Sequence, residues 1–248
     1  MARTWVVGHR GASGHAPENT MAAFRRAVEL GATFIETDLH ISRDARLVAI
    51  HDATLERTTS GKGAVKDYTL AELQELDAGS WFHADFAGEK IPTLEELLEF
   101  AQEKDIGLFL EIKQESAWGL EHGLVAALRA AKESDRVVVL SFSPGILRNV
   151  RRLDSTLMTG LLFEPSKSSG GNILDTAREI GVRQVAPRVD LVTPELVDAA
   201  HKLDLQAVCW TANEPGLMQY AVAAGVDGVM TDFPDRLVNV LAATSSRK

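Results

Sequence analysis

Residues 5–38 read WVVGHRGASGHAPENTMAAFRRAVELGATFIETD and contain the unit that decides the fold. The apolar runs Trp5–His9 and Phe34–Asp38 are typical of short buried strands, and Met21–Leu30 between them has the apolar spacing of a helix. A strand, a helix and a second strand in this order predict a parallel β-α-β unit. Both runs end in imidazole or acidic side chains, so residues able to do chemistry are expected where the strands end.

The same unit repeats along the chain of 248 residues. Further strand-like runs are expected at Leu108–Ile112, Val137–Phe142, Met158–Phe163, Gln184–Pro187, Ala207–Thr211 and Gly228–Thr231. Helical patterns separate most of them, at Leu94–Glu103, Glu121–Lys132, Pro194–Leu203 and Pro215–Ala224. Eight strands that alternate with helices predict one α/β domain, residues 1–248, folded as a closed (β/α)8 barrel, the TIM barrel. An open doubly wound sheet is the alternative, but no Gly-x-Gly-x-x-Gly follows the first strand.

One further strand-like run, Leu47–His51, begins only five residues after the second strand, whose extension reaches Ile41. A parallel crossover needs about a dozen residues, so this run is expected to return as an antiparallel hairpin, with Asp38 roughly opposite His51. Residues 53–92 come next, with a short helix expected at Leu70–Leu76. They are longer than an ordinary loop and are predicted to form a small insertion that caps the carboxyl-terminal face of the barrel. A decorative subdomain without substrate contacts is the alternative.

Composition and charge exclude several functions. With 45% hydrophobic and 25% charged residues, the chain has an ordinary globular composition. Its formal net charge of -9 argues against a nucleic-acid-binding surface and against stable membrane association, because both need clustered Lys and Arg. The absence of a membrane span or a signal-peptide core predicts a cytoplasmic protein. Cys209 is the only cysteine, so neither a disulfide framework nor a Cys-based zinc site is expected.

Three acidic residues are predicted to point into the mouth of the barrel. Side chains alternate faces along a strand, so Glu36 shares a face with Asp38, and Glu111 shares a face with Lys113. Carboxylates that gather without a cation repel one another, and three of them predict an oxygen-coordinated divalent ion, Mg²⁺ or Ca²⁺. Zinc fits less well because it prefers nitrogen and sulfur ligands. Salt bridges with Arg10 and Lys113 are the alternative explanation for these acids.

His9 and His51 are the two histidines expected at strand ends beside the acids. A pair of imidazoles on either side of a metal-bound phosphodiester provides a general base and a general acid, and the two roles are interchangeable at this stage. Arg10 and Lys113 are expected to bind phosphate oxygens. Trp210, at the end of the seventh strand, lines the pocket in one interpretation and packs in the core in the other.

The remaining candidates receive structural interpretations. His83, His122 and His201 are expected at the surface or in packing roles. Asp232 closes the eighth strand and is interpreted as structural.

The ordered motifs resemble those of one enzyme family. Bacterial glycerophosphodiester phosphodiesterases show the same succession of short motifs, namely His9–Gly11, Pro17–Thr20, Glu36–Asp38, His51–Asp52, Leu110–Lys113, Trp210–Asn213 and Gly225–Asp232. Residues 55–59, 78–82 and 90–94 are similar to that family's insertion. The resemblance implies a TIM barrel that hydrolyses glycerophosphodiesters to glycerol 3-phosphate and an alcohol with a divalent cation. By position, it implies that His9 and His51 are the acid–base pair, that Glu36, Asp38 and Glu111 hold the metal, and that Arg10, Lys113 and Trp210 contact the substrate.

Two other functions stay open from the sequence. A related barrel phosphodiesterase of the phospholipase D or cyclising type would act on lipid headgroups, but the chain shows neither a clear secretory signal nor a clear apolar membrane loop. A non-catalytic barrel that binds phosphodiesters could discard one histidine or acid, whereas this chain keeps them all. The sequence is compatible with several alcohol headgroups, with water or a substrate hydroxyl as the first nucleophile, and with a monomer or an oligomer.

Overall fold

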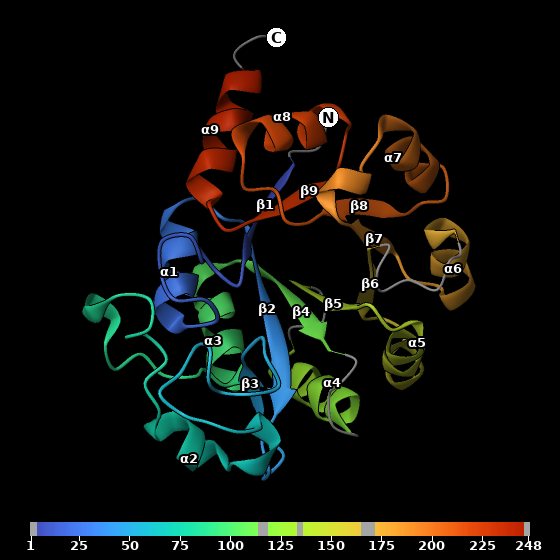
Figure 1. The fold of residues 1–248 in the computed structure, drawn as a ribbon. Coiled ribbons are helices and arrows are strands. Elements are labelled where there is room, and N and C mark those ends of the chain that lie inside the picture. Colours follow the sequence, from blue (N-terminus) through green and yellow to red (C-terminus); the bar gives the residue numbers. More distant parts are fainter. Residues whose placement is uncertain (1–3, 114–118, 133–135, 165–171, 246–248) are drawn as a thin grey trace.

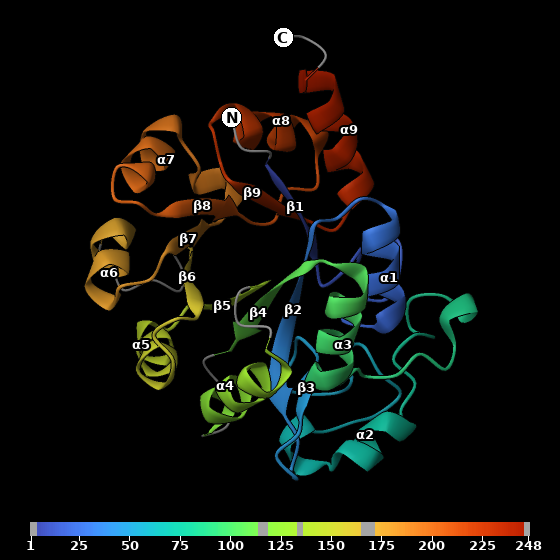
Figure 2. The same cartoon turned by 180° about the vertical axis from the view of Figure 1, so that it is seen from behind.

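The computed structural model describes residues 4–113, 119–132, 136–164 and 172–245, and a closed barrel of eight parallel strands lies at its centre (Figure 1, Figure 2). The barrel strands are β1 (Trp5–His9), β2 (Phe34–Ile41), β4 (Gly107–Ile112), β5 (Val137–Ser141), β6 (Met158–Phe163), β7 (Gln184–Pro187), β8 (Gln206–Cys209) and β9 (Gly228–Thr231). They follow one another around the barrel in chain order, and the last strand pairs with the first to close it. The predicted (β/α)8 barrel is therefore confirmed.

Helices surround the barrel in both views (Figure 1, Figure 2). They are α1 (Met21–Glu29), α3 (Leu94–Lys104), α4 (Leu120–Ala131), α5 (Pro144–Leu153), α6 (Ile173–Ile180), α7 (Pro194–His201), α8 (Pro215–Ala223) and α9 (Pro234–Ser245). Side-chain caps fix several of the starts: the hydroxyls of Thr20, Thr93 and Thr193 accept hydrogen bonds from backbone N–H groups in the first turns of α1, α3 and α7. The helices predicted from periodicity begin and end within two residues of those observed.

Alternating side chains along each strand create two separate cores. Outward-facing residues such as Val6 and Leu108 pack against the helices in the larger core. Inward-facing residues fill the barrel itself: Val7, Phe109, Val138, Leu140, Leu162, Ala186, Val208 and Met230. Because the faces alternate with a period of two, Glu36 and Glu111 continue the inward faces that carry Phe34 and Phe109 lower in the barrel. The apolar floor and the ionic rim thus come from the same faces of the strands.

The hairpin after β2 is confirmed. Strand β3 (Leu47–Ala49) runs antiparallel to the end of β2, with Leu39 opposite Ala49. The backbone N–H of Ile50 donates to the carbonyl oxygen of Asp38 at 3.0 Å, so His51 lies one residue past the position facing Asp38. The turn therefore carries His51 back to the mouth of the barrel, as its length predicted.

Residues 53–92 have an apolar cluster of their own. The segment contains α2 (Leu70–Glu75) and the 3₁₀ turns η1 (Val65–Asp67) and η2 (Ala84–Phe86), and α2 matches the predicted short helix. Its buried side chains, together with two from β3 and its end, are Val48, Ile50, Leu55, Val65, Leu73, Ala78 and Ile91. The insertion is thus held against the hairpin by apolar packing. Its action as a cap over the substrate stays a prediction.

Two strands end two residues earlier than predicted. Strand β8 ends at Cys209, two residues earlier than expected, because Trp210 makes only an isolated bridge to Arg188 beyond the ladder. Strand β3 ends at Ala49 rather than at His51. Among the described residues, no helix has the length and apolarity that crossing a membrane would require.

Candidate active site

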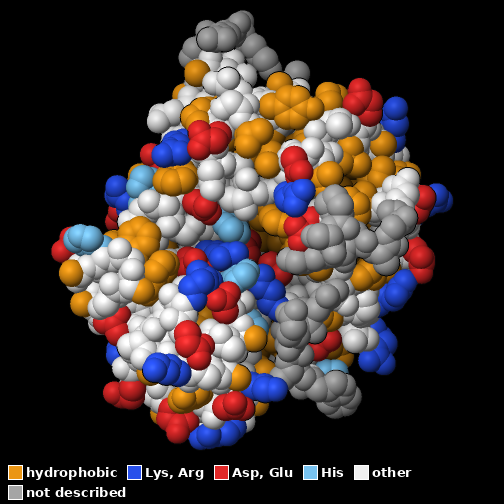
Figure 3. All heavy atoms as spheres, in the orientation of Figure 1, with side chains coloured by type: hydrophobic (Ala, Val, Ile, Leu, Met, Phe, Trp, Pro, Cys, Tyr) orange, Lys and Arg blue, Asp and Glu red, His pale blue; other side chains and the backbone are white. Residues whose placement is uncertain are grey.

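The carboxyl ends of the parallel strands open into a pocket of about 140 Å³. Charged and imidazole side chains line one side, and they are His9, Arg10, Glu36, His51, Glu111 and Lys113. Apolar and aromatic side chains line the other, with one acid among them, and they are Leu140, Phe142, Leu162, Glu164, Trp210 and Met230. Figure 3 shows basic, acidic and histidine side chains gathered in a hollow near the centre of this face. The pocket therefore brings together the predicted site residues except Asp38, which is buried beside Glu111.

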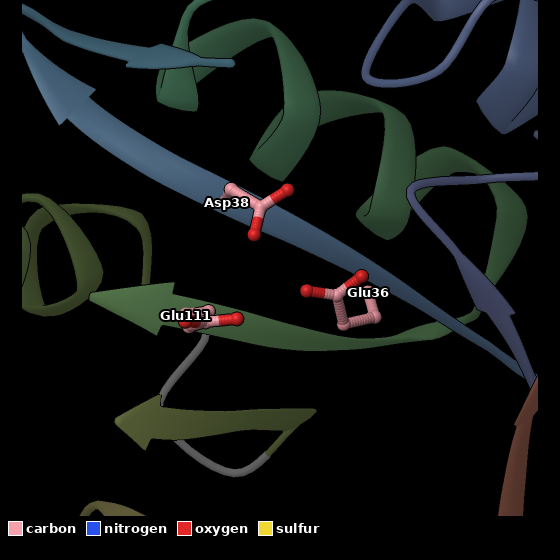
Figure 4. Close-up of side chains that lie close together, drawn as sticks. All are labelled: Glu36, Asp38 and Glu111. Carbon is pink, nitrogen blue, oxygen red and sulfur yellow. The ribbon is translucent and has the colours of Figure 1, made fainter. Parts of the chain in front are cut away.

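Three buried carboxylates form the centre of the charged side. Glu36 and Asp38 come from β2, and Glu111 comes from β4, where it lies directly beside Asp38 in the strand register. One oxygen from each carboxylate lies within 4.8 Å of the others. Figure 4 shows the three side chains directed toward a common space between the two strands.

Two cations lie against these acids. The Nζ atom of Lys113 is 2.7 Å from Asp38 Oδ1 and 2.8 Å from Glu111 Oε1. Arg10 places Nε 3.3 Å from Asp38 Oδ2, and its backbone N–H donates to Glu36 Oε2 at 3.0 Å. The salt bridges raised as an alternative from the sequence are therefore present, and they neutralise part of the acidic charge.

The pKa values show that this neutralisation is incomplete. Burial pushes the pKa of Asp38 upward, but the charges of Lys113 and Arg10 outweigh it and hold that pKa well below its usual range. Burial and the negative charge of Asp38 raise the pKa of Glu36 to about 7. Burial also raises the pKa of Glu111, although Lys113 opposes the shift. Three acids facing two cations leave excess negative charge in a buried place.

This donor set fits a hard divalent cation. Carboxylate oxygens are the ligands that Mg²⁺ and Ca²⁺ prefer, and a doubly charged ion would relieve the repulsion that raises the pKa of Glu36. Of the described residues, Glu36, Asp38 and Glu111 form the one group with the spacing of a metal site. Nitrogen and sulfur ligands that would favour zinc are absent from this group.

His9 is held by an aspartate from the other end of the chain. Its Nδ1 lies 2.7 Å from Asp232 Oδ1, and the same carboxylate accepts hydrogen bonds from the Ser13 hydroxyl at 2.9 Å and the Asn213 amide at 2.6 Å. Because a carboxylate only accepts, the proton lies on Nδ1 and Nε2 is the nitrogen left for chemistry. Burial lowers the pKa of His9, but the hydrogen bond to Asp232 and the charge of Glu36 outweigh it, so the pKa is raised.

The interpretation of Asp232 as merely structural is therefore incomplete. A signal was available in the sequence, because a closed barrel places the last strand beside the first, and the observed register pairs Thr231 with Gly8. The next residues along the two strands are Asp232 and His9. Barrel closure thus predicts their proximity.

His51 has a matching arrangement. Its Nδ1 lies 2.6 Å from Asp52 Oδ1, which again places the proton on Nδ1. His40 Nε2 lies 3.1 Å from the carbonyl oxygen of His51 and helps to fix the backbone. Burial lowers the pKa of His51 below its ordinary value, against the opposing charge of Asp38. Both histidines are therefore held through Nδ1 by an aspartate, but the pKa of His9 is raised and the pKa of His51 is lowered.

The loop after β1 is shaped to bring Arg10 into the site. Arg10 has a left-handed backbone with φ of 54°. Gly11 follows with φ of 85°, and a Cβ atom there would lie 2.6 Å from a backbone carbon of Ala23 in α1, so only glycine fits. Further along the loop, the Asn19 amide donates to Asp38 Oδ2 at 2.9 Å. Sequence reasoning did not assign Asn19 to the site.

Trp210 belongs to the pocket wall rather than to the core alone. Its indole N–H donates to the carbonyl oxygen of Ala186 at 2.7 Å, which fixes the ring. Phe142 packs edge-on against it, with ring centroids 5.5 Å apart. His83 and His122 are exposed, as predicted, and His201 lies 2.9 Å from Asp227 outside the pocket.

A pocket of this kind, with cations and imidazoles around a buried acidic centre and an apolar wall opposite, suits an anionic phosphate ester that carries an organic group. Fold and site together define the class of TIM-barrel phosphodiesterases.

Comparisons with known proteins give the family. Residues 9–236 match the model of the glycerophosphoryl diester phosphodiesterase family, and the chain belongs to that family. A glycerophosphodiester phosphodiesterase of Caldanaerobacter subterraneus subsp. tengcongensis is 39% identical over 241 residues, which cover 96% of this chain and 98% of the relative. Another, from Bacillus subtilis, is 35% identical over 94% of this chain and 85% of its own length.

Solved structures agree with this assignment. The Oleispira antarctica phosphodiesterase in complex with the product sn-glycerol-3-phosphate superposes with a TM-score of 0.87 at 28% identity, over 97% of each chain. The glycerophosphodiester phosphodiesterase of Agrobacterium tumefaciens gives a TM-score of 0.84 at 27% identity, over 95% of this chain and 99% of that one.

Proposed function

We propose that this pocket carries out the family's reaction through His9 and His51, with a divalent cation held by the three acids. The reaction itself follows from the family and its named relatives: the chain is an enzyme that hydrolyses glycerophosphodiesters to glycerol 3-phosphate and an alcohol. The observation that supports the mechanism is the pair of imidazoles, each held through Nδ1 by an aspartate at the rim of the acidic cluster.

Glu36, Asp38 and Glu111 would hold the cation, and the chemistry of their oxygens favours Mg²⁺ or Ca²⁺. When bound, such an ion neutralises phosphate charge and polarises the phosphorus toward attack. The raised pKa of Glu36 supports this assignment, because a buried carboxyl that is reluctant to ionise gains from a nearby positive charge.

The two histidines move the protons. Hydrolysis forms one phosphorus–oxygen bond and breaks another, so the attacking hydroxyl must lose a proton and the departing alcohol oxygen must gain one. We assign one transfer to Nε2 of His9 and the other to Nε2 of His51. With water as the nucleophile, these two transfers are needed once. With a hydroxyl of the substrate's own glycerol as the first nucleophile, the alcohol leaves as a cyclic phosphate forms, and water then opens that ring to glycerol 3-phosphate with the same two transfers in a second step.

Arg10 and Lys113 are proposed to contact the phosphate. A guanidinium can form two parallel hydrogen bonds to phosphate oxygens, and an ammonium adds a compact charge. Trp210 is proposed to contact one ester group of the substrate across the apolar wall of the pocket. The ring is held in place for this role by its hydrogen bond to Ala186.

The test is release of glycerol 3-phosphate, measured in a coupled assay on the parent protein and on His9→Ala and His51→Ala. We expect both variants to lose the activity, and a chelator to abolish it until Mg²⁺ or Ca²⁺ is restored. His122→Ala, which removes an exposed histidine on α4, is the matched control. Activity that persists after complete metal removal, or in either catalytic variant, would refute the mechanism.

Phosphorus NMR of the product mixture provides a second check. A phosphate monoester is expected, whereas an accumulating cyclic phosphate would indicate the cyclising type of barrel phosphodiesterase. A cytoplasmic location stays a prediction, and cell fractionation tests it.

A further inference from the structure

Arg57, in the insertion, lies between the carboxylates of Asp52 and Glu18, and each of these also contacts a residue of the active site. Its Nε and one terminal nitrogen donate to Asp52, at 2.6 and 3.1 Å. Its two terminal nitrogens donate to Glu18, both at 2.8 Å. The planar guanidinium is therefore bidentate to each of two acids, a geometry that no other cationic side chain can reproduce.

The first carboxylate orients a histidine. Asp52 accepts from His51 Nδ1 at 2.6 Å through Oδ1, the oxygen that also accepts from Arg57. The angle of the Asp52 carboxylate therefore depends on Arg57. The direction of the His51 ring depends in turn on that carboxylate, as with the outer partners of other catalytic histidines.

The second carboxylate orients the phosphate-binding arginine. Glu18 Oε1 accepts from Arg10 Nη1 at 2.9 Å and from Arg57 at 2.8 Å. Arg10 reaches on from this contact to Asp38. Arg57 is thus connected through Asp52 to His51 and through Glu18 to Arg10, two separate groups at the rim of the pocket.

The backbone that carries Arg57 is well anchored. Its neighbours Leu55 and Thr58 are buried, and Leu55 belongs to the apolar cluster of the insertion. The carbonyl oxygen of Leu55 accepts from the N–H of Thr59 at 3.1 Å, which closes a turn around Arg57. Figure 1 shows the insertion beside β3 and the end of β2, where it can transmit this order to the site.

A simple stabilising salt bridge is the competing explanation. The Arg57 side chain is 42% exposed, and exposed ion pairs contribute little to stability. Arg57 makes two bidentate contacts, and each of the two carboxylates also binds a group at the rim of the pocket, His51 or Arg10. An isolated surface pair would not show such an arrangement. The contacts of Arg57 therefore serve to position the residues of the site rather than to stabilise the fold.

We propose that Arg57 is a positioning residue, through which the insertion holds His51 and Arg10 in their working arrangement. The proposal rests on the proposed function of those two residues. It assigns the insertion a part in the reaction without requiring that any of its residues touch the substrate.

The experiment compares Arg57→Ala, Arg57→Lys and Arg43→Ala with the parent in the glycerol 3-phosphate assay. Arg43 is the matched control, because it also contacts the insertion, through the carbonyl oxygen of Asp67 and the carboxylate of Glu72, but lies outside the pocket. We expect Arg57→Ala to lower kcat about 10- to 100-fold and to raise KM, since both Asp52 and Glu18 lose the partner that holds them. Arg57→Lys should keep the melting temperature of the parent but not its kcat, because an ammonium cannot make two bidentate pairs. Arg43→Ala should keep kcat within about twofold of the parent.

A double-mutant cycle tests the route through Asp52. In an Asp52→Ala background, Arg57→Ala should lower kcat less than it does in the parent, because the route through Asp52 to His51 is already lost and only the contact through Glu18 to Arg10 remains to be released. Fully additive losses would overturn the route. The proposal also fails if Arg57→Ala leaves kcat unchanged, if Arg57→Lys restores it fully, or if Arg43→Ala loses as much.

A spectroscopic measurement separates this proposal from the proposed function. The Nδ1 proton of His51, in its short hydrogen bond to Asp52, should give a downfield proton NMR signal in the resting enzyme. Arg57→Ala should remove or broaden it, and Arg43→Ala should not. A parent enzyme inactive on glycerophosphodiesters would refute the proposed function, whereas an unchanged His51 signal in Arg57→Ala would refute the positioning role.

Discussion

Substitution of Asp232 by alanine tests how much His9 depends on its carboxylate partner. The change removes the acceptor of the 2.7 Å contact with His9 Nδ1 and leaves the Ser13 hydroxyl and the Asn213 amide without the same partner. A hydrogen bond to a charged group contributes about 1.5–3 kcal/mol. At about 1.4 kcal/mol per factor of ten, loss of this orienting contact should lower kcat about 10- to 150-fold.

The assay is steady-state release of glycerol 3-phosphate, with thermal unfolding measured in parallel to exclude loss of the fold. Asp235→Ala is the matched control, because Asp235 also pairs with a histidine, His15, at 2.9 Å, and neither residue lines the pocket. We expect the control to keep kcat within about twofold. A kcat for Asp232→Ala close to that of the parent, or an equal loss in Asp235→Ala, would refute the positioning of His9 by Asp232.

Three further outcomes are expected. The metal affinity should fall about tenfold per pH unit below pH 7, because Glu36, with a pKa raised to about 7, must lose its proton to become a ligand. Above that pH the affinity should level off. Calorimetric titration with Ca²⁺ measures this dependence, and an affinity independent of pH would contradict it. Gly11→Ala should destabilise the protein by about 1–3 kcal/mol, since the φ of 85° at Gly11 and the nearby backbone exclude a Cβ atom. Gly216→Ala is the control, because a Cβ atom there would meet nothing within 4 Å, and it should leave the stability unchanged. Denaturant unfolding of both variants tests this difference. Leu73→Ala should cost about 2–5 kcal/mol by emptying the core of the insertion, whereas Leu217→Ala at an exposed site should cost far less, and equal costs would contradict a packed insertion.

The sequence predicted the frame of the molecule because the frame follows from local periodicity. Apolar runs alternate with helical patterns, and this alternation located the barrel strands and placed Glu36, Asp38 and Glu111 on inward faces. The loop of five residues before Leu47 determined the hairpin, since its length allows no other connection. Strand ends were less accurate, as at β8, because pairing with neighbours rather than composition decides where a ladder stops.

The supporting contacts of the site were harder to predict. Several of these contacts come from loops, and they involve Asn19, Glu18 and Arg57. Their partners lie far away in the sequence, and no periodic pattern predicts which residues will meet. Asp52 is adjacent to His51, but adjacency alone does not show that its carboxylate turns back onto the ring. Such contacts depend on side-chain direction in a folded loop, which is decided by packing.

Pairing of the first and last barrel strands has a consequence for how the enzyme is made. His9 is separated by 223 positions from the aspartate that orients it, and β9 is the strand that closes the ring. A ribosome exposes the beginning of the chain long before it has made that last strand. The nascent polypeptide therefore carries His9 early, and the hydrogen bond between His9 and Asp232 can form only after β9 has been made and has paired with β1.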